Sequence, residues 1–237
     1  MSRHQDRKGL GNAITREMHD EDMALIRELG ANTVRLAHYQ HDQYFYDLCD
    51  QYGMVVWAEI PYISEHLPNG RENTISQMKE LIHQNYNHPS VVMWGIFSLL
   101  QAKGDDPSPY IRRLNDAAHR MAPTRPTVAC SNQDGSLNFI TDLIVWQQEV
   151  GWEKGSPDDV AVWRDLLRRN WSHLASGVCY GEPGFPAHQY NAVPPVSRTN
   201  WIPEQRQSRF HEAYAKNLEQ DSLFWGVWVN NLFDYGS

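Results

Sequence analysis

The sequence contains little that would place it in a membrane, in a disulfide-bonded secreted scaffold or on nucleic acid. Its three cysteines, Cys49, Cys130 and Cys179, are odd in number and far apart, which predicts free thiols rather than a disulfide framework. No apolar run approaches the about 20 residues of a membrane span. The formal net charge of −8 lacks the basic excess that nucleic-acid binding requires. We therefore expect neither a membrane nor a nucleic acid as partner.

Other signals are also missing. The stretch "MSRHQDRKG" (1–9) has no apolar segment, so the sequence predicts no signal peptide and a cytoplasmic location. No glycine-rich phosphate fingerprint follows a predicted strand, which removes the usual dinucleotide-binding interpretation. No lysine lies at a predicted strand end, so Schiff-base chemistry is not expected, and no metal-ligand set is complete. The sequence thus predicts neither a metal nor a cofactor.

The chain does contain enough apolar residues for a large core. It has 237 residues, of which 41% are hydrophobic, and it is most simply one domain over 1–237. Nine tryptophans and eleven tyrosines are many for this length. Most of them are explained by core packing, but aromatics at this density also line concave sites for sugars and other flat ligands. A small-molecule ligand is the expected partner.

Helical and strand patterns alternate along the chain. We expect helices over 19–30, 43–53, 72–88, 108–121, 157–171 and 203–220, and strands over 32–39, 54–61, 90–96, 126–130, 142–147, 174–181 and 222–233. Strands separated by helices of this length form βαβ units and a parallel sheet. Seven strands can be counted, and an eighth would precede Arg3. The sequence therefore predicts an α/β fold of (β/α)8 TIM-barrel type.

In such barrels the functional residues lie at the carboxyl ends of the strands. The residues at these ends are His4, Arg35–Tyr39, Glu59, Ser98–Leu99, Ser131–Asn132, Trp146–Glu149, Cys179–Glu182 and Asn230–Asp234. Ser98 and Leu99 stand out, because an enzyme of this fold is expected to carry a polar catalytic group where that strand ends.

Several strings, in order along the chain, resemble the catalytic barrel of glycoside hydrolase family 2, the β-galactosidase and β-glucuronidase group. They are "RHQD" at 3–6, "RLAHY" at 35–39, "WAEIP" at 57–61, "NHPSVVMWGI" at 87–96, "PTRPT" at 123–127 and "FDYGS" at 233–237. The resemblance implies a barrel trimmed at its first strand and last helix, without the family's β-sandwich domains. Such trimming would leave two sheet edges, so we expect self-association through them.

The resemblance also implies a retaining glycosidase with two carboxylates about 5–5.5 Å apart. The family's Asn-Glu pair falls on Ser98 and Leu99, and the glutamate of its Glu-Tyr-Gly string falls on Cys179. We therefore expect native glycosidase activity to be lost. Because the changes gather at strand ends while the scaffold strings persist, we interpret the pocket as rebuilt by design. The alternative is a degenerate homologue that kept binding.

The leading hypothesis for function is a hydrolase with Cys179 as nucleophile, acting on an activated aromatic ester. The resemblance places the cation of Arg35 beside this position, and a cation lowers a thiol pKa. His4, His38 and His188 each match family histidines, and any of them could serve as the base. Their spacing does not choose among them.

Further residues complete the predicted site. Ser98 and Gln147 are expected to stabilise an oxyanion. The substrate would contact Arg35, Ser98, Leu99, Trp146, Gln147, Glu182 and Asn230. Three rival hypotheses remain, namely a general-base enzyme that uses Glu149, a non-catalytic ligand pocket, and a residual glycosidase. We expect the Glu182 side chain to lie on a solvated loop rim.

Overall fold

The structure, a computed structural model, describes residues 1–101, 105–152, 155–189, 201–218 and 221–233. It contains two compact units, one formed by Met1–Val145 with Asn231–Ser237 and the other by Trp146–Asn230. Each unit is described by itself below, and the single domain over 1–237 stays a prediction. No helix in the described part of the chain is long and apolar enough to cross a bilayer.

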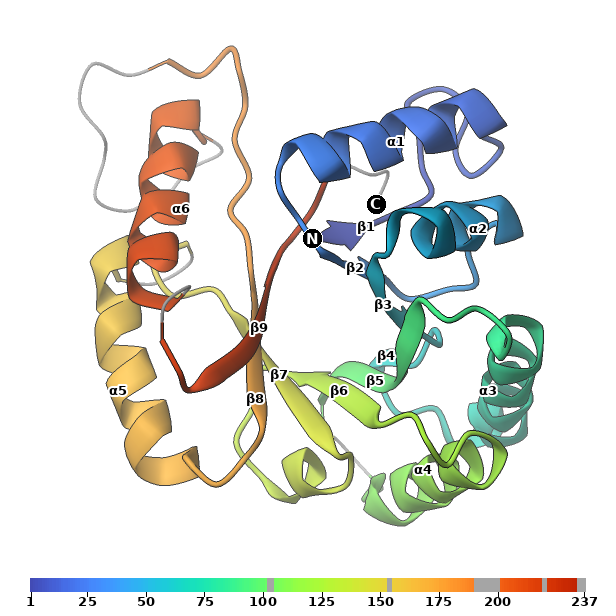
Figure 1. Ribbon diagram of the computed structural model, residues 1–237. Coiled ribbons are helices and arrows are strands. Elements are labelled where there is room, and N and C mark those ends of the chain that lie inside the picture. Colours follow the sequence, from blue (N-terminus) through green and yellow to red (C-terminus); the bar gives the residue numbers. More distant parts are fainter. Residues whose placement is uncertain (102–104, 153–154, 190–200, 219–220, 234–237) are drawn as a thin grey trace. The chain divides into compact units, whose positions relative to one another are not determined.

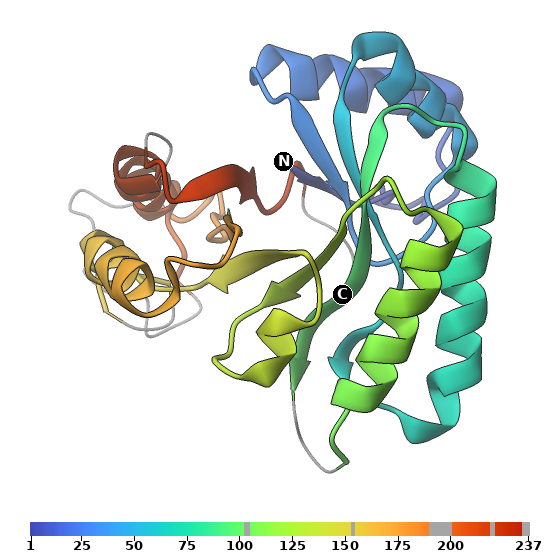
Figure 2. The same ribbon diagram turned by 60° about the horizontal axis from the view of Figure 1, so that its bottom comes forward.

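The first unit is a parallel sheet with helices along its outer side (Figure 1). Its strands are β1 (Ser2–Arg3), β2 (Thr33–Leu36), β3 (Val55–Glu59), β4 (Ile63–Glu65), β5 (Val91–Gln101) and β6 (Thr127–Ser131). Its helices are α1 (Arg16–Glu28), α2 (Gln43–Tyr52), α3 (Arg71–Asn85) and α4 (Ser108–Met121), with short 3-10 turns η1 (Pro68–Gly70) and η2 (Ser136–Phe139). The strands pair in the order β1-β2-β3-β5-β6, and β4 adds to β5. Figure 2 shows α3 and α4 running side by side.

The second unit contains η3 (Pro157–Asp159), α5 (Val160–Trp171), β8 (Ser176–Tyr180), α6 (Glu204–Leu218) and β9 (Phe224–Val229). Strand β7 (Leu143–Gln148) begins in the first unit and ends in the second. Strands β8 and β9 pair in parallel, with Cys179 opposite Trp228. Val178 and Tyr180 of β8 pack with Phe210 and Tyr214 of α6. Side chains alternate along a strand, so Cys179 points to the opposite face of β8.

Local sequence explains the ends of the helices. The Asp42 side chain accepts a hydrogen bond from the Tyr44 backbone N–H at 2.8 Å, which caps the start of α2. Gly53 ends the same helix with a left-handed φ of 65°, a conformation that costs glycine little. Every predicted helix and strand is present, with ends that differ by a few residues. Residues 219–220 of the predicted last helix lie outside the described residues.

One glycine fixes how closely β3 and β5 approach. Gly95 pairs with Glu59, and a Cβ placed on Gly95 would lie 2.2 Å from the Glu59 Cβ and 2.5 Å from the Trp57 Nε1. No larger residue fits without moving the Glu59 side chain. Glycine at 95 therefore positions a carboxylate at the end of β3.

The predicted strand 90–96 is longer than expected. Strand β5 continues to Gln101, because β4 pairs with the extension through Ile63 opposite Ser98 and Glu65 opposite Gln101. Leu99 lies within this extension and has a φ of 50°. A left-handed conformation is strained for a leucine. The expectation that the strand stops before Ser98 is therefore wrong.

The expectation that the first strand is missing is also wrong, although the strand is short. Ser2 and Arg3 form β1 and pair with Arg35 and Leu36 of β2. On its other side, the Ser2 carbonyl accepts a hydrogen bond from the Leu232 N–H at 2.9 Å. Residues 234–237, where the predicted "FDYGS" string ends, lie outside the described residues. Self-association through sheet edges stays a prediction.

Candidate functional site

A buried cluster of charged groups lies at the strand ends of the first unit. Arg35 on β2 donates from Nε to Glu59 Oε2 and from Nη2 to Glu59 Oε1, both at 3.0 Å. The same Nη2 donates to the Ser98 hydroxyl at 2.9 Å. All three side chains are almost fully buried, and the guanidinium lies 4.3 Å from the Trp57 ring centre. The structure thus brings predicted residues Arg35 and Ser98 together around the Glu59 carboxylate.

Two histidines complete this cluster. The His38 backbone N–H donates to Glu59 Oε1 at 3.0 Å, and its ring Nδ1 lies 2.5 Å from the same oxygen. Burial alone would raise the pKa of Glu59, but Arg35 and His38 outweigh it and hold that pKa at about 2. Burial, with the nearby charges of His38 and Arg35, lowers the pKa of His4 to about 4. At neutral pH, Glu59 is therefore an anion and His4 is uncharged.

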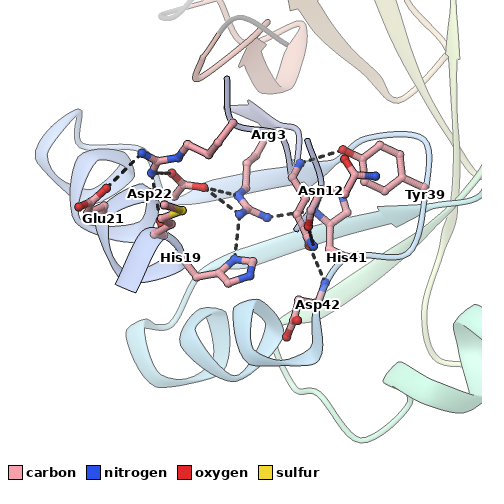
Figure 3. Close-up of polar contacts among 11 residues, drawn as sticks. Arg3, Asn12, His19, Glu21, Asp22, Tyr39, His41 and Asp42 are labelled. Carbon is pink, nitrogen blue, oxygen red and sulfur yellow. Dashed lines mark hydrogen bonds and ion pairs between the residues drawn. The ribbon is translucent and has the colours of Figure 1, made fainter. Parts of the chain in front are cut away.

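A buried polar network supports the end of β1, directly before His4. Figure 3 shows the Arg3 guanidinium between Asp22, His19 and His41. It contacts Asp22 Oδ2 at 2.8 Å, His19 Nδ1 at 2.9 Å and His41 Nδ1 at 3.0 Å. Burial and the Arg3 charge lower the pKa of His41 well below its usual range. His41 therefore belongs to this network rather than to the Glu59 cluster.

None of the three cysteines forms a disulfide, and all three are buried. Cys49 lies in α2, as expected for a core residue, and burial raises the pKa of its thiol to about 12. Cys130 lies in β6 and Cys179 in β8, each with 0% exposure. The prediction of free thiols is confirmed. The nucleophilic role of Cys179 and its pairing with a histidine stay predictions.

Two predicted residues of the second unit meet at its strand ends. The Asn230 side chain donates to Gln147 Oε1 at 3.0 Å, and both side chains are half-buried. Trp146, which we expected to contact a substrate, is buried and donates from its indole N–H to the Ser176 hydroxyl at 3.1 Å. Gln147 and Asn230 therefore form a small amide pair next to a packed indole.

Glu182 does not lie on a solvated rim. It is 4% exposed, and its carboxylate forms an ion pair with Arg206 of α6, with Nη1 and Oε1 2.8 Å apart. Arg206 also donates to the backbone carbonyls of Gly151 and Trp152. Burial raises the pKa of Glu182 to about 7, although Arg206 opposes this. The expected rim position is wrong, because a buried cation on α6 draws the side chain inward.

The remaining predicted residues of this unit have structural contacts. His188 Nδ1 accepts a hydrogen bond from the Ile202 N–H at 3.1 Å, and its ring stacks on Trp201 at 4.3 Å. The Glu149 carbonyl accepts from the Trp152 N–H at 3.0 Å, and its side chain is half-buried. A base role for either residue stays a prediction.

Sequence reasoning missed the partners that lie far away along the chain. No local sequence pattern predicts that Arg206 pairs with Glu182, or that Arg3 contacts Asp22, His19 and His41. Another missed group is Asp47, Asp50 and His88, whose candidate ligand atoms lie within 4.8 Å of one another. The Asp50 carboxylate, however, already contacts His88 Nδ1 at 2.6 Å and the Ser90 N–H at 2.9 Å. These contacts join α2 to the loop before β5.

Comparison with known families places these residues in context. The family described as "Glycosyl hydrolases family 2, TIM barrel domain" matches residues 1–173. A β-glucuronidase of Bacteroides fragilis is 41% identical over 99% of this chain and 35% of its own length. A putative β-glucuronidase of Formosa agariphila is 33% identical over 98% of this chain and 29% of its own length. The chain thus spans about a third of the length of these curated relatives.

Solved structures agree on the fold. An FMN-binding β-glucuronidase from Facaelibacterium prausnitzii L2-6 superposes with a TM-score of 0.93 and 36% identity, over 99% of this chain and 37% of that one. A putative β-galactosidase from Bacteroides fragilis superposes with a TM-score of 0.96 and 32% identity, over 99% and 36%. The predicted (β/α)8 TIM-barrel fold is confirmed.

Proposed function

Because the chain belongs to glycosyl hydrolase family 2 and has its TIM-barrel fold, we propose that it is the barrel part of a β-glucuronidase-like protein that binds a sugar ligand without hydrolysing it. The proposal is supported by the resemblance of the chain's strand-end strings to those of the family, which aligns Leu99 and Cys179 with the family's two carboxylates. A retaining glycosidase needs a carboxylic acid at one position and a carboxylate at the other. Leu99 has no proton to donate to a leaving group.

The carboxylate that remains in the first unit does not replace them. Glu59 is held at a pKa of about 2, so it carries no proton near neutral pH. Both of its oxygens already accept hydrogen bonds, from Arg35 and from the His38 backbone. Removing it from Arg35 would leave a buried charge unpaired, which costs about 3–5 kcal/mol. Glu59 therefore acts as a fixed anion and not as a general acid.

The polar groups around Glu59 support ligand binding. His4 is half-buried and uncharged at neutral pH, so its ring can donate and accept hydrogen bonds to hydroxyls. Its ring centre lies 5.6 Å from that of His38 and 5.8 Å from that of Tyr39. Flat rings with polar edges are suited to the faces and hydroxyls of a sugar.

Turnover of 4-nitrophenyl β-D-glucuronide and β-D-galactoside tests the loss of hydrolysis. We expect none above a heat-treated control for the unmodified chain. The double variant Leu99→Glu with Cys179→Glu should gain measurable turnover, whereas the matched Leu99→Gln with Cys179→Gln should not. Turnover by the unmodified chain that survives in the glutamine variant would contradict the proposal.

Binding is measured separately by calorimetry with methyl β-D-glucuronide and methyl β-D-galactoside. At least one should bind saturably, and His4→Ala should weaken that binding about tenfold, the effect of losing one good hydrogen bond. Arg120→Ala, an exposed change on α4, is the matched control. Absence of binding to both sugars would also contradict the proposal.

The hypothesis of a Cys179 nucleophile on an activated ester has less support. Its side chain is fully buried, and attack on an ester requires access to the sulfur. Mass spectrometry after treatment with a 4-nitrophenyl ester tests it. An acyl adduct on Cys179 in preference to Cys49 and Cys130, with a burst that Cys179→Ala removes, would establish that activity. The designed origin of the pocket stays an interpretation.

A further inference from the structure

A histidine and two carboxylates meet between α2 and the start of β5, within the first unit. Asp47 and Asp50 are three residues apart on α2, so their carboxylates lie on the same side of the helix. His88 comes three residues before β5, and one of its ring nitrogens lies within 4.8 Å of an oxygen of each carboxylate. Such groups also gather without a metal ion, so the state of the His88 ring decides whether a cation is needed.

A chain of amide hydrogen bonds fixes which nitrogen of His88 carries hydrogen. The buried Asn85 side chain donates from Nδ2 to the Leu81 carbonyl at 2.8 Å, which leaves its Oδ1 as the acceptor. This oxygen accepts from Gln43 Nε2 at 3.0 Å, so Gln43 Oε1 is the atom that lies 3.2 Å from His88 Nε2. An amide oxygen can only accept, and His88 Nε2 must therefore be the donor.

The other ring nitrogen of His88 then faces a negative charge. In a neutral imidazole with its hydrogen on Nε2, the Nδ1 atom has only a lone pair. It lies 2.6 Å from Asp50 Oδ2, and an ionised carboxylate is also only an acceptor. Two electron-rich atoms at this distance need a cation that both can bind, which is either a second proton on the ring or a metal ion. We propose that Asp47, Asp50 and His88 bind a divalent transition-metal ion such as Zn²⁺.

The surroundings favour a metal ion over a proton. Asp47 brings a second carboxylate, which a proton between Asp50 and His88 does not need. Ser90 is 7% exposed, and its hydroxyl is in hydrogen-bond geometry with none of the described groups. Burial raises the pKa of Asp50, but the hydroxyl and N–H of Ser90 and the His88 ring outweigh burial and lower that pKa, which places the hydroxyl beside the carboxylate. A buried oxygen is thus available as a fourth ligand.

The hydrogen bond from His88 to Gln43 is of the kind that metal-bound histidines make. A histidine that binds a metal through one nitrogen donates its other N–H to an oxygen, and this fixes the plane of the ring. Zinc with bonds of about 2.0–2.1 Å places tetrahedral ligand atoms about 3.3 Å apart, so small movements of the exposed Asp47 side chain would complete the site. An imidazole ligand favours Zn²⁺ or Co²⁺ over Mg²⁺ and Ca²⁺.

This metal site is independent of the proposed function. His88 and Ser90 precede β5, at the amino end of the strand, whereas His4 and Glu59 lie at the carboxyl ends of β1 and β3. In TIM barrels the amino ends of the strands serve stability rather than catalysis. A metal ion here would link α2 to β5, and an ion that binds only the folded chain stabilises it by mass action.

The experiment uses the full chain after treatment with a chelator, titrated at pH 7 with Zn²⁺ by calorimetry and with Co²⁺ by visible absorption. We expect one tight Zn²⁺ per chain and a rise in melting temperature. Asp47→Asn should weaken Zn²⁺ binding at least about tenfold, yet leave the melting temperature of the metal-free chain unchanged, because this side chain is exposed. Asp116→Asn removes an exposed carboxylate from α4 and should change neither quantity.

Nitrogen NMR spectra of the histidine rings distinguish a metal ion from a proton. With Zn²⁺ bound, His88 should carry hydrogen on Nε2 alone, whereas in the metal-free chain at pH 7 both of its nitrogens should be protonated. The proposal is overturned if no Zn²⁺ binds, if Asp47→Asn binds Zn²⁺ as tightly as the unmodified chain, or if His88 keeps both hydrogens in saturating Zn²⁺. A thiolate charge-transfer band in the Co²⁺ spectrum would also overturn it, because the metal would then be on a cysteine.

Discussion

At the scale of single residues, the adjacent leucines Leu99 and Leu100 differ in backbone conformation and in burial. Leu99 has a left-handed φ of 50° and is half-buried, whereas Leu100 is buried and has no positive φ. A leucine in the left-handed region costs about 1–2 kcal/mol relative to a regular strand conformation. Strain of this kind tends to persist at positions with a functional history. Under the proposed function Leu99 occupies such a position, because the resemblance aligns it with the family's acid/base.

The first prediction compares glycine at these two positions. Leu99→Gly should change the free energy of unfolding by no more than about 1 kcal/mol, because relief of the positive φ offsets the lost apolar contact. Leu100→Gly should cost about 3–5 kcal/mol, because it removes a buried side chain without relieving strain. Urea unfolding followed by fluorescence measures both. If both substitutions lower the free energy of unfolding by the same amount, the strain at Leu99 is small.

The second prediction concerns Glu182. Its folded-state pKa of about 7 lies above its usual value, so the folded protein holds this proton to a higher pH than the unfolded chain does. This part of the stability is fully present below about pH 4.5 and is lost as the pH rises to about 7. Glu182→Gln removes the ionisation, so its stability relative to the unmodified chain should rise by about 2–3 kcal/mol between pH 5 and pH 8.

Melting temperatures measured across that pH range test this prediction. Glu28→Gln, which removes an exposed carboxylate from α1, serves as the control and should follow the unmodified chain at every pH. A Glu182→Gln curve parallel to that of the unmodified chain would mean that the Arg206 ion pair keeps Glu182 ionised throughout.

At the scale of elements, β1 is held mainly by its side chain. Only two residues pair with β2, yet the Arg3 guanidinium joins β1 to Asp22 and His19 of α1 and to His41 before α2. It also lies 3.9 Å from the Phe45 ring centre. One buried cation thus connects a strand to two helices, and this compensates for the few backbone hydrogen bonds of the strand.

The third prediction removes this cation. Arg3→Met should cost about 3–5 kcal/mol, because it leaves the buried Asp22 carboxylate short of its partner. Adding Asp22→Asn should recover part of the loss by removing the unpaired charge. Arg7→Met, which removes the more exposed partner of Asp22, should cost about 1 kcal/mol. Chemical unfolding of the three variants and the unmodified chain measures these differences. If Arg3→Met costs no more than Arg7→Met, the network does not hold β1.

Most elements could be predicted because their signals are local. Gly53 after a helical pattern marks the end of α2, and apolar spacing marks α4 at its observed ends. Strand β4 could not be predicted, since Ile63–Glu65 is too short to show a period and forms only because β5 offers it a partner. The candidate site followed the same rule. Arg35 and Ser98 were predicted because they lie at strand ends. Arg206 was not predicted, because no sequence pattern near Glu182 indicates that a buried cation of α6 pairs with it.

At the scale of the whole molecule, the two compact units differ in size. The first is formed by residues 1–145 with 231–237, and the second by residues 146–230 alone. A smaller unit buries a smaller fraction of its surface and is therefore less stable. The second unit should therefore open at lower denaturant concentration than the first.

The fourth prediction uses the free cysteines as reporters of this order. Cys49 and Cys130 lie in the first unit and Cys179 in the second, all buried. Pulses of a thiol reagent at increasing urea concentration, read by mass spectrometry, should label Cys179 before the other two. Labelling in 8 M urea corrects for intrinsic reactivity. Simultaneous labelling of all three would indicate a single cooperative transition instead.

The hydrogen bond between Leu232 and Ser2 has a consequence for the order of synthesis. A ribosome makes about 5–20 residues each second, so Ser2 emerges roughly 10–50 seconds before Leu232. Throughout this time β1 has β2 as its neighbour but lacks the Leu232 N–H. The Ser2 carbonyl is meanwhile open to water, to chaperones or to another nascent chain. Strand β1, the shortest strand described in the first unit, therefore gains its hydrogen bond to Leu232 only after almost the whole chain has been synthesised.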